Sequence, residues 1–573
     1  MDRIRAHLNC AAMPVELICG GPRGPMPGPA AGWRHGSAVP LAMMGLCCLC
    51  RPLSLALASG ALGGGALGLV FVLAGLLLVL RWRGRPGAQL LVLFLVAVSL
   101  WRIWFVSYGP YDLSGDEAQY WDWSRRPDWN YYTKGPVVAY CIWLGKAVFG
   151  DTTLGVRCMA IVFSFASSLL LYVLGRRLYD EKAAAWSGAL LQVVPILAVY
   201  GVGMTIDSPL IFFWTLSLLL FHWAISSRSR AAWILLGVAV GIGLLTKYTM
   251  AFFWICAFLF LVCSRQRRGR LRRPWPYLGV LASALLLVPV LIWNYQHDWV
   301  NFRHNLGHTK IAEGLQFTFM GLLEFVGSQL GIVTPILLAL MLYSLIRRRK
   351  QDPFCFWFSI PIMAFFLLKS IQGKVEPNWA LTSYIIAVVS FSGFFLRGFG
   401  AFNKHVKRIV VAGVIVAAAG TALAHYPSVI TLVGLPAKWD PSRQVQGYSQ
   451  VGQEVSRLAA TMDKPYFIFS DRYMVTAAMA FYVKGHPVTY CVNLGRRMNQ
   501  YDLWPTFHHL VHYDAIYVTH DSDKLPRELD KAFASHARFE VRILDRRGGE
   551  IRRFTVYLCR DFAGMPLVVP ERY

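Results

Sequence analysis

The chain has 573 residues, of which 56% are hydrophobic and only 15% are charged, and its mean hydropathy is +0.44. Because soluble domains carry about a quarter charged residues, this composition excludes an ordinary soluble protein and indicates a membrane protein. The formal charge is +26, but Lys and Arg lie in short runs between apolar segments and no recognition motif accompanies them, which argues against nucleic acid as a partner.

The first 80 residues divide into two segments. Residues 1–52 are rich in Gly, Pro and Ala without periodicity, and we predict a disordered extension. Residues 53–80 are apolar and long enough to cross a bilayer, although they contain much Gly and Ala. We predict an extra N-terminal hydrophobic helix or a signal-like segment there.

Eleven apolar segments follow, each about as long as a helix that crosses a bilayer. Backbone groups in lipid must be satisfied within the segment, so helix is the expected structure. We therefore predict an α-helical polytopic membrane protein whose transmembrane domain covers residues 88–426. The segments are 88–107, 153–175, 183–201, 208–226, 231–246, 249–264, 277–293, 332–346, 354–370, 380–396 and 408–425.

The loops between these segments alternate in charge. One set, which includes "RWRGR", "SRQRRGRLRR" and "RRRK", is rich in Lys and Arg and is predicted to be cytoplasmic. The other set mixes carboxylates with aromatic rings, as in "GDEAQYW", "MTIDSP", "WNYQHDW" and "KVEPNW". The sequence thus predicts that these acidic and aromatic clusters share the extracytoplasmic face.

The remaining residues, 427–573, have the composition of a soluble domain. Segments 465–470 and 513–520 read as buried strands, 472–483 as a helix, and 538–558 as a hairpin with its turn at Gly548-Gly549. We predict a small α/β domain, which an odd number of spans leaves in the extracytoplasmic space.

The first outer loop holds the densest group of polar residues. Asp116 and Glu117 follow Gly115, which suggests a short helix whose N-terminal amides keep Asp116 ionised. Such a carboxylate can act as a general base or hold a divalent cation, although a solvated helix cap explains the pair equally well. The neighbouring rings, those of Tyr120, Trp121 and Trp123, are expected to anchor the loop at the membrane interface.

Three further charged residues stand where an apolar segment begins or ends. Lys134 in "YYTKGP" can contact a phosphate at headgroup depth, or it can be a snorkelling lysine. Asp207 and Lys247 lie at the ends of otherwise uncharged segments, where charge is costly and usually functional. For Asp207 the alternative is a helix cap ahead of Pro209.

Later loops supply the other candidate substrate-binding residues. Glu376 and Asn378 precede Trp379 and can position a ligand or cap the next helix. His297, followed by Asp298, can belong to an acid/base pair or be structural.

These motifs occur in an order that resembles a known family. "GDEAQYW…YYTKGP", "IDSP", "LLTKYT", "WNYQHDWVNFRHN" and "EPNWA" are similar to motifs of the C-type-fold glycosyltransferases that use polyprenyl-phosphate sugars. That group includes the protein O-mannosyltransferase-like family, the bacterial aminoarabinose transferases and the lipid-A galacturonosyltransferases. The resemblance covers residues 88–425.

The resemblance implies roles for residues of the first outer loop. Asp116 matches the catalytic carboxylate, Glu117 its motif partner and Lys134 the basic residue that meets the donor phosphate. In the aminoarabinose branch an acidic residue that helps to bind a metal precedes this lysine, but here the position is Thr133. We therefore predict no metal ligands and leave a divalent cation open as a cofactor.

The predicted function is an inverting glycosyltransferase of the cell inner membrane. Its partners are a polyprenyl-phosphate-linked sugar donor, an extracytoplasmic acceptor (lipid A, another glycan or a protein) and the lipid bilayer. A cation stabilises the departing phosphate and a carboxylate activates the acceptor hydroxyl. The alternative is a polytopic lipid or sugar transporter, which would require ionisable residues at the bilayer midplane and helices broken at paired positions.

Overall fold

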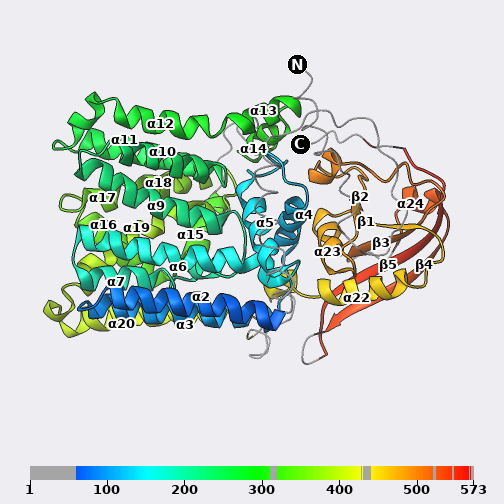
Figure 1. The fold of residues 1–573 in the computed structure, drawn as a ribbon, viewed down its shortest axis with the longest axis horizontal. Helices are drawn as coiled ribbons and strands as arrows, with labels where there is room; N and C mark the ends of the chain where they lie inside the picture. The colour runs from blue at the N-terminus through cyan, green and yellow to red at the C-terminus, as the bar shows by residue number, and fades with distance from the viewer. Residues whose placement is uncertain are drawn as a thin grey trace, which may run out of the picture.

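The protein consists of a bundle of apolar helices joined to a smaller domain with a β-sheet (Figure 1). The computed structural model describes residues 60–309, 319–427, 429, 441–520, 524–544, 548–566 and 568. The predicted extension, residues 1–52, and the first part of the predicted helix 53–80 lie outside the described residues. The second part of that segment belongs to α2 (Gly60–Arg81).

Eight helices in the described residues are long and apolar enough to cross a membrane. A ninth candidate is a pair bent by 97°, α15 (Phe319–Val333) and α16 (Pro335–Arg347), with the break at Thr334 ahead of Pro335. The proline lacks an amide proton and clashes with the preceding turn, which accounts for the break. The eight are α2, α3 (Pro86–Tyr108), α6 (Thr153–Leu178), α9 (Asp207–Ser226), α12 (Trp275–Leu285) with α13 (Val288–Gln296), α17 (Pro353–Trp357) with α18 (Ile360–Ser370), η5 (Pro377–Ala380) with α19 (Leu381–Phe391) and η6 (Ser392–Leu396), and α20 (Lys404–His425).

The predicted fold class is confirmed, but the predicted number of eleven spans differs from the eight or nine candidates. All eleven apolar segments are largely helical, yet three of them form helices shorter than a span. Segment 183–201 breaks ahead of Pro195, where the ring cannot continue the preceding helix. The shorter helices are α7 (Glu181–Leu190), α8 (Pro195–Val199), α10 (Ala231–Leu244), and η2 (Tyr248–Ala251) with α11 (Phe252–Cys263).

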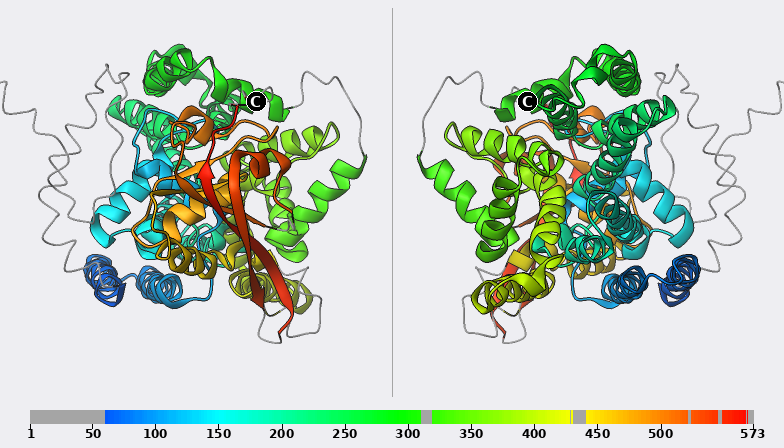
Figure 2. Two further views of the ribbon diagram at one scale, coloured as in Figure 1. Left: turned by 90° about the vertical axis from the view of Figure 1, so that its right-hand side faces the viewer. Right: turned by 90° about the vertical axis from the view of Figure 1, so that its left-hand side faces the viewer.

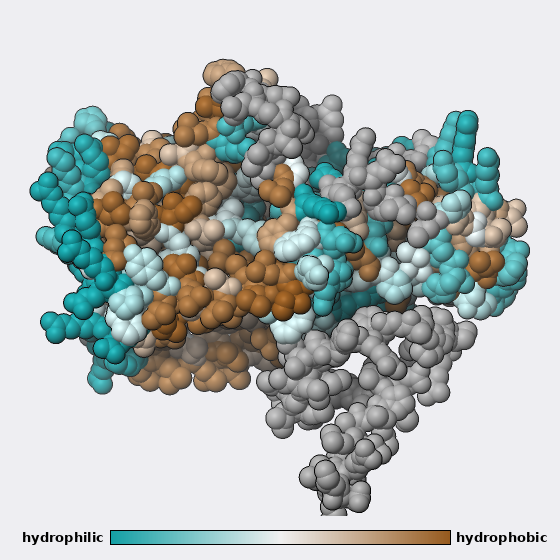
Figure 3. Space-filling model, turned by 90° about the horizontal axis from the view of Figure 1, so that it is seen from above, coloured by the Kyte–Doolittle hydropathy of each residue, from teal (hydrophilic) through white to brown (hydrophobic). Residues whose placement is uncertain are grey.

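The buried share of each helix shows which helices lie at the centre of the bundle and which lie at its edge. The span that contains α19 is 89% buried and that of α6 is 67% buried, whereas those of α2 and α20 are only 22% and 17% buried. The outer helices expose Leu, Val and Phe side chains, and Figure 3 shows apolar side chains along the flank of the bundle. Such a flank suits a lipid environment and would be unusual in water.

The basic loops gather at the end of the bundle away from the sheet domain (Figures 1 and 3). There the hydroxyl of Tyr179, after α6, donates to Asp352, 2.8 Å away, before α17. Arg397, after η6, lies 2.9 Å from Asp180, before α7. The predicted alternation of loops between two ends is therefore present in the fold.

The sheet domain has five strands in the order β2-β1-β3-β5-β4. β1 pairs in parallel with β2 and β3, and β5 pairs antiparallel with β3 and β4. The strands predicted at 465–470 and 513–520, the helix at 472–483 and the hairpin are all present. The elements are α22 (Tyr448–Ala459), β1 (Tyr466–Ser470), α23 (Tyr473–Tyr482), β2 (Thr489–Cys491), β3 (Asp514–His520), α24 (Arg527–Ala532), β4 (Phe533–Leu544) and β5 (Glu550–Phe562).

Short elements lie between the bundle and the sheet. In Figure 1, α4 (Gly115–Ser124) and α5 (Val137–Phe149) separate the two parts, and α23 packs against α4. Figure 2 shows β4 and β5 on the far side of the sheet domain from the bundle. The first outer loop is therefore covered by the sheet domain. The remaining short elements are η3 (Arg268–Arg272), α14 (Val300–Thr309), η7 (Phe399–Ala401), η9 (Pro441–Val445) and η10 (Gln500–Leu503).

Candidate active site

Helix α4 starts at a reciprocal cap that fixes the acidic pair. The Glu117 amide donates to Ser114 Oγ at 3.2 Å, and the Ser114 amide donates to Glu117 Oε2 at 3.0 Å. This capping box satisfies two backbone donors at the helix start. It also turns Asp116 and Glu117 in different directions, so the two carboxylates have different surroundings.

Glu117 is buried and its oxygens are occupied by donors. Arg157 of α6 donates to both carboxylate oxygens at 2.8 Å, and the Met204 amide donates to Oε1 at 2.9 Å. Burial acts to raise the pKa of Glu117, but the Arg157 charge and these hydrogen bonds outweigh it and lower the pKa. Glu117 thus joins α4 to the bundle and to the segment before α9.

Asp116 faces a residue of the sheet domain. The Tyr473 hydroxyl donates to Asp116 Oδ1 at 3.1 Å. Burial raises the pKa of Asp116, although the Tyr473 hydrogen bond and the Lys134 charge act in the opposite direction. The helix amides that were expected to keep Asp116 ionised therefore do not set its charge state alone, because the sheet domain shields the carboxylate from water. A carboxylate with a raised pKa is a better proton acceptor near neutral pH.

Lys134 lies in the same cluster as Asp116, and the backbone next to it, at Gly135, packs closely against the backbone at Leu245. A Cβ at Gly135 would lie 2.0 Å from the Leu245 carbonyl oxygen, so only glycine allows this contact. The Lys134 ammonium interacts electrostatically with Asp116, Asp207 and Lys247. Burial lowers its pKa, and the Lys247 charge adds to that effect.

Asp207 and Lys247 form a buried ion pair beside this lysine. Lys247 Nζ lies 2.8 Å from Asp207 Oδ1, and Asn378 donates to Asp207 Oδ2 at 2.7 Å. Asp207 begins α9 and is only 2% exposed. In the part of the chain that the structure describes, Lys134 has no carboxylate partner within ion-pair distance, whereas the charge of Lys247 is neutralised.

Two predicted substrate-binding residues lie apart from this cluster. Glu376 pairs with Lys374 at 3.1 Å, and the two side chains are 52% and 71% exposed, so the pair belongs to the surface. His297 stacks on Trp293 with ring centroids 4.0 Å apart, and its Nδ1 lies 2.8 Å from the Trp293 carbonyl oxygen. The cluster consequently contains Asp116, Lys134, Asp207, Lys247 and Asn378 of the predicted set.

The aromatic rings of the first outer loop are not interfacial anchors, which corrects the prediction. Trp121 and Trp123 are fully buried and Tyr120 is 4% exposed. Trp121 packs edge-on against Phe481 of α23, with centroids 4.9 Å apart. The rings form the joint between α4 and the sheet domain, because that domain covers the loop.

Sequence reasoning missed two residues that hold the acidic pair. Arg157 had a detectable signal, because a charge within a long apolar segment needs a partner. Tyr473 had none, since nothing local places the start of helix 472–483 next to a loop more than 350 residues earlier. The described residues also contain no group of three His, Cys, Asp or Glu side chains arranged to hold a metal ion.

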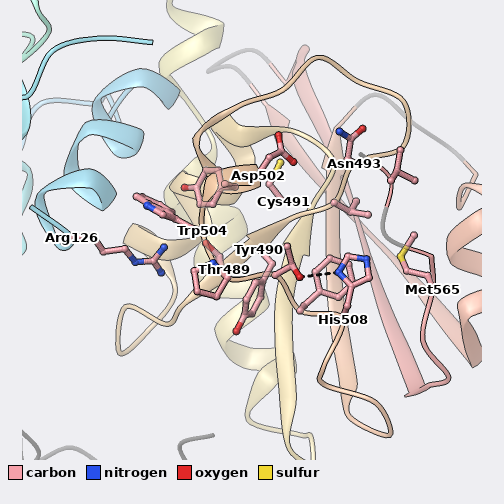
Figure 4. A pocket seen from close by; sticks show the side chains of 15 residues that line it. Arg126, Thr489, Tyr490, Cys491, Asn493, Asp502, Trp504, His508 and Met565 are labelled. Carbon is pink, nitrogen blue, oxygen red and sulfur yellow. Dashed lines mark hydrogen bonds between the residues drawn. The ribbon is translucent and has the colours of Figure 1, made fainter. Parts of the chain in front are cut away.

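A pocket lies in the sheet domain beside Arg126, which follows α4 (Figure 4). Arg126 is stacked 4.1 Å above the Trp504 ring at one side, and His508 and Met565 lie at the other. The residues that line it include neither Asp116 nor Lys134. This pocket is therefore separate from the carboxylate and lysine cluster.

Comparisons of sequence agree with the motif resemblance. Residues 133–293 match the family described as dolichyl-phosphate-mannose-protein mannosyltransferase. The lipid A galacturonosyltransferase RgtD of Rhizobium johnstonii is 29% identical over 304 residues, which cover 52% of this chain and 64% of that protein. An undecaprenyl phosphate-alpha-4-amino-4-deoxy-L-arabinose arabinosyl transferase of Pseudomonas aeruginosa is 37% identical over 166 residues, 28% of this chain and 30% of its own length. The chain thus spans less than two thirds of these curated relatives.

Comparison of structures supports the fold over a longer stretch. The crystal structure of ArnT from Cupriavidus metallidurans in the apo state has a TM-score of 0.56 and 18% identity, and the match covers 82% of this chain and 98% of that one. The same protein bound to undecaprenyl phosphate has a TM-score of 0.55, with 81% and 97% covered. The predicted resemblance to polyprenyl-phosphate-sugar glycosyltransferases is confirmed by these similarities, and the fold is that of ArnT.

Proposed function

We propose that this protein is a membrane glycosyltransferase that moves a sugar from undecaprenyl phosphate, or a related polyprenyl phosphate, to lipid A. The observation that carries the proposal is a partly buried lysine, Lys134, at one end of an apolar bundle. The described residues offer it no carboxylate within ion-pair distance, and its charge interacts with the partly buried carboxylate of Asp116. A lipid-linked phosphate donor requires an apolar surface for its chain and a cation at headgroup depth. The names of the similar proteins favour the same donor and acceptor classes.

In this mechanism Lys134 contacts the donor phosphate as a point charge. Asp116 accepts the proton of the acceptor hydroxyl while the oxygen of that hydroxyl attacks the anomeric carbon of the donor sugar. The new carbon–oxygen bond forms while the bond from the anomeric carbon to the phosphate oxygen breaks, and polyprenyl phosphate leaves. A single displacement inverts the anomeric centre. Burial favours this step because a charge acts more strongly in a site that excludes water.

Asp207, Lys247 and Asn378 have a supporting role in the proposal. Their hydrogen-bonded group joins the start of α9, the end of α10 and the segment before α19. Because Asp207 neutralises Lys247, Lys134 is left as the cation that binds the phosphate. Lys247 has a structural role, which is to link the segments around the site through Asp207. Glu376 and His297, which lie away from the cluster, are assigned to the rim of the site and not to the chemistry.

We place the protein in the cell inner membrane, with the sheet domain on the extracytoplasmic side. The end with Arg- and Lys-rich loops would then face the cytoplasm, in agreement with the positive-inside rule. Lipid A and polyprenyl-phosphate sugars would meet at the opposite end, beneath the sheet domain.

The experiment compares lipid A from a deletion strain with lipid A from its parent by mass spectrometry. Loss of a sugar mass, restored by the wild-type gene but not by the Asp116→Asn gene, is the expected result. Purified protein in liposomes should then transfer aminoarabinose or galacturonic acid from its polyprenyl phosphate to lipid A. Unchanged lipid A, together with movement of the labelled donor across liposomes without transfer, would refute the proposal in favour of a transporter.

A further inference from the structure

The sheet domain contacts the first outer loop at both ends of α4. Near the start, the Tyr482 hydroxyl lies 2.6 Å from the Leu113 amide, which donates to it. Near the end, the Tyr501 hydroxyl donates to Asp122 Oδ2 at 2.9 Å. The two contacts come from α23 and η10, so the domain is attached near both ends of the helix. This attachment fixes where Asp116 lies relative to the domain.

The approach of α23 to α4 is as close as a backbone allows. A Cβ at Gly115 would lie 2.4 Å from the Met474 Cβ, which no side chain can accommodate without a shift. Gly115 directly precedes Asp116, and Met474 directly follows Tyr473. Because Gly115 has no side chain, α23 can pack close enough for the Tyr473 hydroxyl to reach the Asp116 carboxylate.

The contact between these two side chains is directed and specific. Tyr473 donates to Asp116 Oδ1 at 3.1 Å, and among the described residues no donor lies in hydrogen-bond range of Oδ2. Burial and the neighbouring carboxylate raise the pKa of Tyr473, so the phenol stays protonated and donates to the ionised carboxylate. One oxygen of Asp116 is thereby held, while the other is left for the acceptor hydroxyl.

From these contacts we propose that Tyr473 is a positioning residue for the carboxylate that accepts the proton, and that the sheet domain thereby completes the active site. This inference rests on the proposed glycosyl transfer. A hydrogen bond from a fixed phenol selects one rotamer of Asp116 before the substrate arrives, and this preorganisation lowers the barrier. The role of the domain is then to position a catalytic group as well as to cover the site.

The hydrogen bond from Tyr473 also affects the pKa of Asp116. It stabilises the ionised carboxylate and so opposes the effect of burial on the pKa of Asp116. Removal of the hydroxyl should raise that pKa further, because the other groups around the carboxylate remain. The titratable groups that interact with Asp116 are Lys134, Glu117, Tyr120, Tyr200 and Tyr473.

The test measures sugar transfer against pH for Tyr473→Phe in the full-length protein. The substrates are lipid A and the polyprenyl-phosphate sugar that the wild type uses, either aminoarabinose or galacturonic acid. We expect kcat to fall ~10-fold or more and the acid limb of the pH profile to move up by about one pH unit. The matched control is Tyr501→Phe, which removes a Tyr–Asp hydrogen bond between the same two parts and should leave the acid limb in place.

A second substitution keeps the shape of the side chain. Trifluorotyrosine at position 473 is a stronger donor, so the acid limb should move down instead of up. If wild type transfers sugar but neither change at position 473 moves the acid limb, the positioning role is refuted while the proposed function stands. If wild type transfers no sugar from either donor, the proposed function fails and the inference fails with it.

Discussion

The Lys247 ammonium lies 2.8 Å from Asp207 Oδ1, so one of the two lysines at the site is neutralised within the protein. Lys134, which follows Thr133 in the first outer loop, has no such partner among the described residues. Two lysines that look alike in the sequence thus differ in what they can bind. This difference supports the proposal that Lys134 contacts the donor phosphate.

Lys134→Ala should weaken binding of undecaprenyl phosphate. A hydrogen bond to a charged group contributes about 1.5–3 kcal/mol, which corresponds to an affinity loss of about 10- to 100-fold. The measurement is a titration of undecaprenyl phosphate into protein held in nanodiscs. Lys374→Ala, at an exposed ion pair, is the control and should bind normally. Equal affinity of Lys134→Ala and wild type would contradict the assignment.

Asp207→Asn should destabilise the protein, because it leaves the buried Lys247 charge without a partner. Loss of one partner of a buried ion pair costs about 3–5 kcal/mol. Thermal unfolding in detergent should show the loss, and the double variant Asp207→Asn with Lys247→Met should recover much of it. If the double variant instead unfolds at a lower temperature than Asp207→Asn alone, the two substitutions act additively and the two residues do not stabilise the protein as a pair.

Glu117→Gln should also lower stability, and by a comparable ~3–5 kcal/mol, because Arg157 keeps its charge in a buried place. The unfolding midpoint in detergent is the readout. Asp116→Asn, one residue earlier and with no cation in ion-pair contact among the described residues, should unfold close to the wild-type temperature. The reverse order of the two midpoints would mean that the carboxylates have been assigned the wrong roles.

The pH dependence of transfer should reflect the shifted groups. Asp116 must be deprotonated to accept a proton, and its raised pKa places the acid limb above the value near 3.9 of an ordinary aspartate. Lys134 must be protonated, and its lowered pKa places the alkaline limb below the usual value near 10.4. Rates measured from pH 4 to 10 test both limbs, and Lys134→Arg should move only the alkaline one upward. Full activity at pH 4 would be inconsistent with the buried base.

The helical class, the apolar segments, four of the five strands of the second domain and five residues of the cluster were accessible from the sequence, whereas the short strand β2 was not predicted. These features depend on local composition and on motifs such as "GDE" and "TKGP", which carry their own signal. The lengths of spans were less accessible, because Pro195 and the Thr334-Pro335 step break helices that hydropathy alone would continue. The burial of Trp121 could not be predicted, since it depends on a domain that begins more than 300 residues later.

We propose that Asp116 accepts the proton during sugar transfer, and the purified Asp116→Asn variant isolates this step. The variant should bind undecaprenyl phosphate with wild-type affinity, unfold at the wild-type temperature and yet transfer sugar to lipid A at least ~100-fold more slowly, which is the range attributed to a general base. Transfer by this variant at the wild-type rate would show that Asp116 is not the group that accepts the proton.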